Sequence, residues 1–239
     1  MTDSGLRSRY DYRQEIVRSL APVRPLLAPS RRVWMLLPLG LLLTITAPLA
    51  AGQRGDLSAY APLITWGLTG LQSLLGVWLL ALGLREAVPG QNVSWRALTF
   101  AGALSIILIG GVTVLTNSAS ATFVPPGREW QYWAECVGWP MALGAPFMVL
   151  TTLMAARAFP TRPVIAGGLC GMSAGILSDA GWRLSCWISE PTHIVGSHGL
   201  AILALTAGGA LLAVCVDRSR WRRLWSAEGR KVPRRNPGR

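Results

Sequence analysis

The feature that most constrains this chain is a series of six apolar stretches, each long enough to cross a lipid bilayer. A transmembrane helix needs roughly 20 mostly apolar residues. Only 14% of the 239 residues are charged, whereas a soluble domain has about a quarter. The stretches cover residues 33–52, 60–84, 97–116, 135–156, 163–182 and 195–216. We therefore predict an all-α, polytopic membrane protein with six transmembrane helices.

The remaining residues form two basic segments and short connectors. We predict a cytoplasmic N-terminal segment over 1–30, a transmembrane domain over 31–216 and a basic cytoplasmic tail over 217–239. The first 30 residues are polar and basic, so we expect no cleavable signal peptide. The fourth and fifth spans are joined by a short turn with Pro160 and Pro163, which predicts an antiparallel helix pair.

The basic residues indicate the orientation of the spans. Six spans place both termini on one side, and 20 of the 23 Arg and Lys residues lie on that side. The other side has only Arg54, Arg128 and Arg183. Short loops rich in Arg and Lys stay in the cytoplasm, so we predict that both termini are cytoplasmic. Anionic lipid headgroups account for the net charge of +12, and we expect no direct contact with nucleic acid.

Tryptophans fall near both ends of the spans. Indole rings prefer the boundary between lipid and water, so we interpret them as membrane anchors. Those near the inner boundary are Trp34, Trp95, Trp221 and Trp225, and those near the outer boundary are Trp130, Trp133, Trp139, Trp182 and Trp187.

The four cysteines divide into two groups. Cys170 and Cys215 lie within spans, and we interpret both as packing residues. Cys136 begins the fourth span and Cys186 follows the fifth, both on the non-cytoplasmic side. The outer compartment permits disulfides. The pair can therefore be a structural disulfide, a redox or metal sensor, or two unpaired thiols without a role.

Polar side chains gather in sequence around this cysteine pair. Thiolate and imidazole ligands together suit soft or borderline metals, although the spacing matches no established metal motif. His198 within the sixth span is expected to make an interhelical hydrogen bond or to act as a ligand. Asp179 has the same two interpretations, with Arg183 one helical turn away as its partner. The polar residues concerned are Glu135, Asp179, Glu190, His193 and His198.

Glycines at intervals of four mark one face of the fifth span. Gly167, Gly171 and Gly175 would let a neighbouring helix approach closely. We interpret them as packing residues that make the fifth helix rigid between Cys186 and Arg162.

The N-terminal segment contains a short amphipathic pattern. Tyr12, Ile16 and Leu20 share one helical face, and Pro22 with Pro25 would end the helix. The segment is either an anchor on the membrane surface or a helix that binds a groove in a partner protein. No catalytic arrangement is evident along the chain, and we expect no enzymatic activity.

The whole chain resembles the NrsF family of six-span bacterial anti-sigma factors. Cys136 and Cys186 match the two exterior cysteines of that family, and Ser197 stands where the family tends to have tryptophan. The residues that carry the resemblance are the run Leu20-Ala21-Pro22-Val23-Arg24-Pro25-Leu26, Cys136, Pro140, Pro146, Arg157, the turn Pro160-Thr161-Arg162-Pro163, Gly167, Gly171, Gly175, Cys186 and His198-Gly199.

The resemblance implies a stress-response regulator in the bacterial inner membrane. The N-terminal segment, with Tyr12, Ile16, Leu20, Pro22 and Arg24, would bind an extracytoplasmic-function sigma factor. Redox change or transient heavy-metal binding at the cysteine pair would release that sigma factor, with His198, His193 and Asp179 as auxiliary residues. We expect no resident cofactor.

Two other functions fit the same spans. An accessory subunit of a larger membrane complex would have similar packing glycines and tryptophans, with lipids and other subunits as its partners. A small-molecule transporter is less favoured, because no inverted repeat with paired broken helices is evident.

Overall fold

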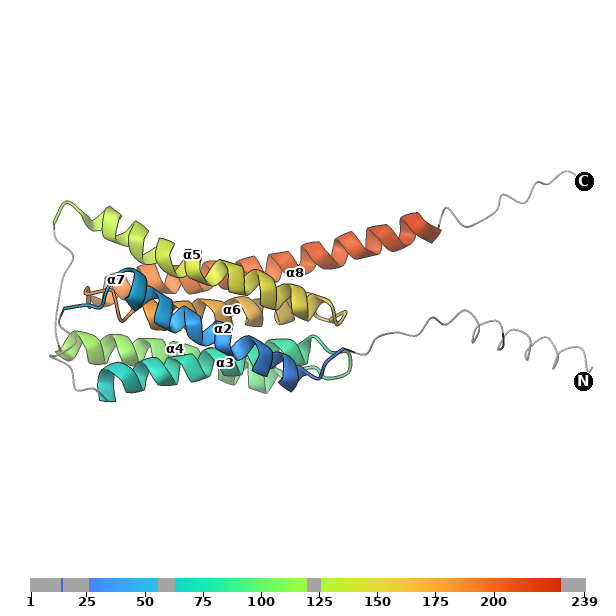
Figure 1. Ribbon diagram of the computed structural model, residues 1–239, viewed down its shortest axis with the longest axis horizontal. Coiled ribbons are helices and arrows are strands. Elements are labelled where there is room, and N and C mark those ends of the chain that lie inside the picture. Colours follow the sequence, from blue (N-terminus) through green and yellow to red (C-terminus); the bar gives the residue numbers. More distant parts are fainter. Residues whose placement is uncertain (1–13, 15–25, 56–62, 120–125, 229–239) are drawn as a thin grey trace, which may run out of the picture.

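Six long helices form the protein, packed side by side in one bundle (Figure 1). The computed structural model describes residues 14, 26–55, 63–119 and 126–228, and these contain no strand. All six long helices are long and apolar enough to cross a membrane, which confirms the predicted fold class. The elements are α2 (Pro29–Ala50), η2 (Leu63–Gly67), α3 (Leu68–Glu86), α4 (Trp95–Ala119), α5 (Glu129–Ala156), α6 (Pro163–Trp182), α7 (Pro191–His193), η3 (Ile194–His198) and α8 (Gly199–Glu228).

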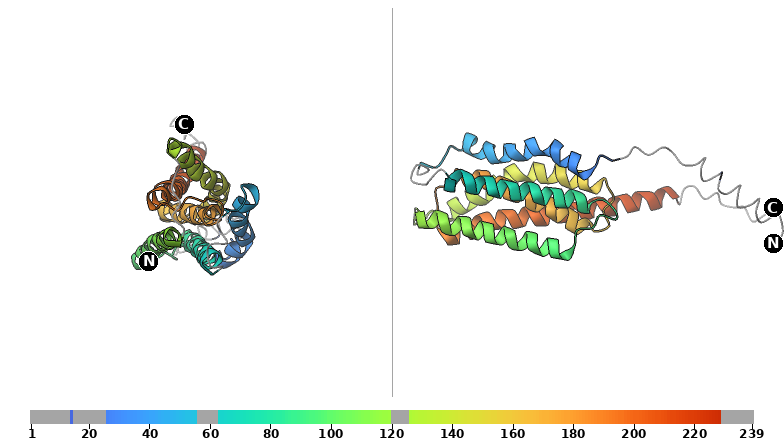
Figure 2. Two further views of the ribbon diagram at one scale, coloured as in Figure 1. Left: turned by 90° about the vertical axis from the view of Figure 1, so that its left-hand side faces the viewer. Right: turned by 90° about the horizontal axis from the view of Figure 1, so that it is seen from below.

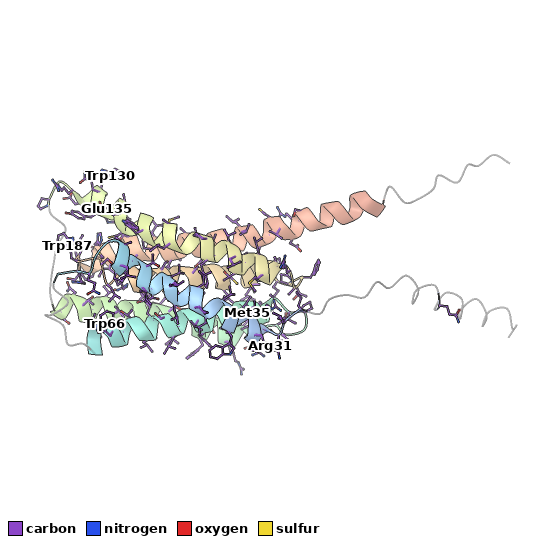
Figure 3. The ribbon with its side chains drawn as sticks, viewed as in Figure 1. Arg31, Met35, Trp66, Trp130, Glu135 and Trp187 are labelled. Carbon is purple, nitrogen blue, oxygen red and sulfur yellow. The ribbon has the colours of Figure 1, made fainter. Side chains whose placement is uncertain are left out.

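The two ends of the bundle differ in what they contain. Helix α2 begins and α8 ends toward the same end, which we call the terminal end (Figure 1). The opposite end contains Cys136, Cys186 and the short α7, and we call it the cysteine end. Figure 3 shows Trp130, Glu135 and Trp187 at the cysteine end and Arg31 with Met35 toward the terminal end.

Three spans begin at least four residues earlier than the apolar stretches predict. Helix α2 begins at Pro29 rather than 33, α5 at Glu129 rather than 135, and the last span with α7 at Pro191 rather than 195. Hydropathy detects only the apolar part of a helix, whereas polar residues such as Gln131 can continue it past the membrane boundary. Cys136 therefore lies about two turns inside α5 instead of at its start.

Helix α6 is the centre of the bundle. Of the 18 consecutive residues that form its most apolar part, 78% are buried, against 22–50% in the other five spans. Figure 2, seen along the bundle, shows the other helices arranged around it. Helix α5 packs against α6 as its antiparallel neighbour, as the short proline turn between them predicts. Asp179, near the end of α6, is therefore fully surrounded by protein.

The predicted glycine face of α6 lies directly against α8. A Cβ atom added at Gly171 would collide with the carbonyl oxygen of Leu205, and one at Gly167 with that of Gly209. A Cβ atom at Gly175 would lie 2.9 Å from the Cα of Ile202. The two backbones touch along this face, so the packing interpretation of the glycines is confirmed.

Helix α5 has two prolines in its interior, Pro140 and Pro146. Proline has no N–H group, so each removes one hydrogen bond from the helix. Both follow Cys136 along the helix, in the direction of the terminal end.

Helix α2 crosses the whole bundle beside α6. Its backbone passes so close to Gly181 that a Cβ atom there would lie 2.7 Å from the carbonyl oxygens of Leu43 and Thr44. At the terminal end, the buried Arg32 donates to the carbonyl of Leu27 at 2.8 Å and to that of Met154 at 3.5 Å. Helix α2 is thus held to α6 at one end and to α5 at the other.

A buried carboxylate joins α3 to α6 at the terminal end. Glu86 accepts two hydrogen bonds from Arg162, at 2.6 and 2.7 Å, and one from the backbone N–H of Val93 at 2.6 Å. Arg162 also donates to the carbonyl of Val93 at 2.8 Å. We call this set of three residues the terminal clasp. It fixes the turn before α6 and the loop before α4 to the end of α3.

Candidate functional site

The two exterior cysteines lie in contact at the cysteine end. Cys136 is in the second turn of α5, and Cys186 lies four residues after α6 ends. Their Sγ atoms are 3.4 Å apart, and both residues are buried, at 3% and 6% exposure. The predicted antiparallel pairing of the fourth and fifth spans brings these two cysteines together. The S–S bond of a disulfide is about 2.05 Å, so these atoms are free thiols close enough to be joined by a small movement.

Both histidines of the chain are beside the cysteine pair. His193 ends the short α7, and His198 ends the η3 turn that leads into α8. Each is buried, and their rings lie edge to face with centroids 6.1 Å apart. One ligand atom from each of Cys136, Cys186, His193 and His198 falls within 4.8 Å of the others. We call these four residues the Cys-His cluster.

Asp179 fixes the orientation of the His198 ring. Its Oδ1 atom accepts a hydrogen bond from His198 Nδ1 at 2.6 Å. The other oxygen, Oδ2, accepts from Gln72 at 2.6 Å and from Arg183 at 2.9 Å. The predicted pairing with Arg183 and the predicted interhelical hydrogen bond of His198 are both confirmed. Gln72 on α3 was not predicted, because no local pattern connects it with a residue on α6.

The side chains at this end include several buried polar atoms that lack a hydrogen-bond partner among the described residues. Three of these atoms are the imidazole nitrogens His193 Nδ1, His193 Nε2 and His198 Nε2. Such atoms are rare in native proteins, and each calls for a physical reason. The nitrogens belong to the Cys-His cluster, so they are available to a ligand that binds there.

An aromatic cavity opens onto the two sulfur atoms. It has a volume of about 280 Å³ and is lined by both cysteines, by Glu135 and by aromatic side chains. Trp139 stacks on Trp182 at 5.5 Å between ring centroids, and Tyr132 meets Trp187 edge to face at 5.6 Å. We call these four rings and the cavity they line the aromatic vestibule. Glu135 and Trp187 mark its position in Figure 3.

Hydrogen bonding changes the acidity of Cys186, which lies outside the membrane spans. The pKa of its thiol is lowered, first because Cys136 hydrogen-bonds to its sulfur and further because the two imidazoles lie nearby, against the opposite effect of burial. The thiolate is the form of cysteine that binds metals and reacts with oxidants. The lowered pKa favours the thiolate form of Cys186.

Helix α2 reaches this site with its far end. Ala47 packs in the same apolar cluster as Cys136, Cys186 and Trp182. Beyond the helix, Arg54 donates its backbone N–H to the carbonyl of Leu184 at 2.9 Å and its guanidinium to that of Trp187 at 3.3 Å. The loop that follows α2 is thus bonded to the segment that contains Cys186.

Two interpretations of single residues were wrong. Trp182, read as a membrane anchor, is 6% exposed and lies in the wall of the vestibule. Cys215, read as a packing residue, is exposed on the outside of α8. Cys170 is buried in α6, as expected. The predicted partner-binding residues Tyr12, Ile16, Leu20, Pro22 and Arg24 lie outside the described residues.

The fold and the site together define a six-span helical membrane protein with a buried cysteine and histidine cluster near one end. The family model for the negative regulator of sigma F (NrsF) matches residues 16–221, which is most of the chain. The protein therefore belongs to the NrsF family, whose members negatively regulate a sigma factor. No curated protein and no solved structure matches the chain.

Proposed function

We propose that this protein is an anti-sigma factor of the bacterial inner membrane. Its cytoplasmic N-terminal segment, residues 1–30, sequesters a sigma factor of the extracytoplasmic-function class. A redox or heavy-metal signal at Cys136 and Cys186, on the non-cytoplasmic side, releases the sigma factor as part of a stress response. The family match supports control of a sigma factor, and the contact between the two thiols supports a redox or heavy-metal signal.

The positions of the proposed sensing site and of the helix that follows the N-terminal segment support this proposal. The Cys-His cluster is at one end, and the helix that follows the N-terminal segment begins at the other (Figure 1). Most basic residues of the chain belong to segments on the terminal side of the spans. Short segments of that kind remain cytoplasmic, which supports an outer location for the cysteine end.

The contact between α2 and the cysteine site is the observation that carries the proposal. Helix α2 follows the N-terminal segment directly, and Ala47 near its far end belongs to the same apolar cluster as both cysteines. Gly181, near the end of α6, lets the backbone of α2 approach closely at Leu43 and Thr44. A rearrangement of the thiol pair therefore acts on the same helix that leads to the sigma-binding segment. The signal shifts the protein between a holding and a releasing state by its different affinity for the two.

Oxidation is the first of two chemical forms that the signal can take. The two thiols lose two protons and two electrons as the S–S bond forms. Hydrogen peroxide is a suitable oxidant, since it accepts them and becomes two molecules of water. The second form is a soft metal ion, which displaces the thiol protons and binds both sulfur atoms. Disulfide formation draws α5 and the segment after α6 closer together, whereas a bound ion links them through the two sulfur atoms.

Co-purification tests sequestration directly. The full-length protein in detergent should retain an extracytoplasmic-function sigma factor of the same organism. Ile16→Asp with Leu20→Asp should abolish retention, because the substitutions place charge on the predicted apolar face. Gln14→Asp is the matched control on another face and should retain the partner. If other membrane subunits co-purify and no sigma factor does, the protein is an accessory subunit instead.

A transcription reporter tests the signal site. Cys136→Ser and Cys186→Ser should each abolish the response of sigma-dependent transcription to cadmium and to peroxide. Cys215→Ser is the control, because its thiol lies on the outside of α8. An unchanged response in both site variants would show that the pair has no sensing role.

A further inference from the structure

We infer that Cys136, Cys186, His193 and His198 bind a single tetrahedral d10 metal ion such as Zn²⁺, Cd²⁺ or Cu⁺, with Asp179 as an outer partner of His198. This inference deepens the proposed function, on which its regulatory meaning rests. The site that senses the signal would then consist of four metal ligands rather than of two thiols alone. The ligands come from α5, from the segment after α6, from α7 and from η3.

The separations of the ligand atoms fit one ion. Zinc binds thiolate sulfur at about 2.3 Å and imidazole nitrogen at about 2.0–2.1 Å, so tetrahedral ligands lie about 3.3–3.8 Å apart. The sulfur atoms are already 3.4 Å apart, and all four atoms are within 4.8 Å of one another. Movements of about an ångström complete the site.

The histidines provide the second, independent observation. The chain has only two histidines among its 239 residues, and both converge on the cysteine pair. His193 is 2% exposed, and neither of its ring nitrogens has a hydrogen-bond partner among the described residues. A buried imidazole without partners is costly unless something binds it. A metal ion in the cluster would supply the missing partner.

Asp179 prepares His198 for the same ion. An ionised carboxylate can only accept hydrogen bonds, so His198 Nδ1 donates to it and Nε2 is the ring nitrogen left to bind a metal, which would displace any proton there. Among the described residues, this Nε2 atom has no hydrogen-bond partner. Ligating histidines usually donate their second N–H to a carboxylate, which fixes the ring and raises its basicity. Gln72 and Arg183 in turn hold the carboxylate in place.

The aromatic vestibule gives the ion a route to the sulfur atoms. The exposed Glu135 lies in its lining and attracts cations. The faces of Trp and Tyr rings also attract cations. Both cysteines line the cavity, so an ion that enters it meets the two thiols first and the imidazoles behind them.

Zinc binding to the reduced full-length protein in detergent tests the inference. Equilibrium dialysis should give one Zn²⁺ per chain, and X-ray absorption should show two sulfur and two nitrogen ligands. His193→Ala removes one nitrogen and breaks no side-chain hydrogen bond of the described residues. It should weaken binding by more than the roughly 10- to 100-fold typical of an outer partner. Cys215→Ser is the control and should bind as the wild type does.

The failures of the two proposals are distinguishable. A zinc shell without imidazole nitrogen, or unchanged affinity in His193→Ala, overturns the four-ligand site. The thiol-based release of a sigma factor would then still stand if Cys136→Ser abolishes the reporter response. A shell of two sulfurs and two nitrogens in a protein that retains no sigma factor establishes the site and removes the proposed function.

Discussion

A buried carboxylate lies near each end of α6, and the two differ in the groups that surround them. In the terminal clasp, Glu86 accepts hydrogen bonds only from groups of the protein, and Arg162 fills both of its oxygens. At the cysteine end, Asp179 also has its donors, but the imidazole that it holds has a nitrogen with no hydrogen-bond partner among the described residues, and this nitrogen belongs to the Cys-His cluster. A closed set of hydrogen bonds stabilises a fold. A set with unpartnered ligand atoms is open to a ligand from outside.

The largest effect is expected from opening the terminal clasp. Arg162→Ala leaves the fully buried Glu86 carboxylate without its cation, and stranding such a charge costs about 3–5 kcal/mol. The free energy of unfolding in detergent, measured by denaturant titration, should fall by that amount. Arg85→Ala, at an exposed neighbouring position, should have little effect. A small loss in Arg162→Ala would mean that the clasp is not structural.

Zinc should stabilise the protein through the cysteine end alone. Free Zn²⁺ at 100 times its dissociation constant should add about 2.7 kcal/mol to the free energy of unfolding. A chelator should remove this gain. The comparison between the ends predicts the same gain in Arg162→Ala, measured from its lower baseline, and none in Cys136→Ser. A gain that survives in Cys136→Ser would place the zinc elsewhere.

Zinc affinity should depend on the carboxylate of Asp179 but not on that of Glu86. Asp179→Asn should weaken Zn²⁺ binding roughly 10- to 100-fold, because the amide no longer fixes the ring of His198 as a carboxylate does. Glu86→Gln should leave the affinity unchanged. Competition with a chromophoric chelator measures both variants. Equal losses in the two would show that the effect passes through the stability of the bundle.

The smallest effect is expected in the vestibule wall. Trp139→Leu removes the stacked ring from Trp182, and such aromatic pairs contribute about 0.5–1.5 kcal/mol beyond their burial. The loss should appear in the free energy of unfolding without a change in the X-ray absorption spectrum of bound zinc. Trp130→Leu, at an exposed position, is the control. An altered spectrum in Trp139→Leu would mean that the ring takes part in the cluster.

The spans and the cysteine pair could be predicted because their signals are local. Long apolar runs define membrane helices, and a short proline turn makes α5 and α6 neighbours. Cys136, Cys186, His193, His198 and Asp179 all fall near the same ends of these spans, so topology alone brings them together. The bundle in turn brings α3 into contact with α6 at Gln72, which no sequence interval connects with Asp179.

The orientation of single side chains could not be predicted. Lipid and protein interior are both apolar, so a membrane helix has little amphipathic pattern to distinguish its two faces. Cys215 therefore gave no sign that it faces outward, and Trp182 none that it faces inward. The orphaned nitrogens of His193 are a property of the packed structure and have no signature in the chain.

Pro140 removes a backbone hydrogen bond beside the site. A helix residue normally bonds its carbonyl to the N–H four positions later, and four positions after Cys136 that N–H is missing. The stretch 129–139, which carries Cys136, therefore has one backbone hydrogen bond fewer to the rest of α5. The other three ligands lie between α6 and α8, whose backbones pack closely at the glycines. An ion bound by all four ligands would add a second connection between the two parts, in place of the missing hydrogen bond.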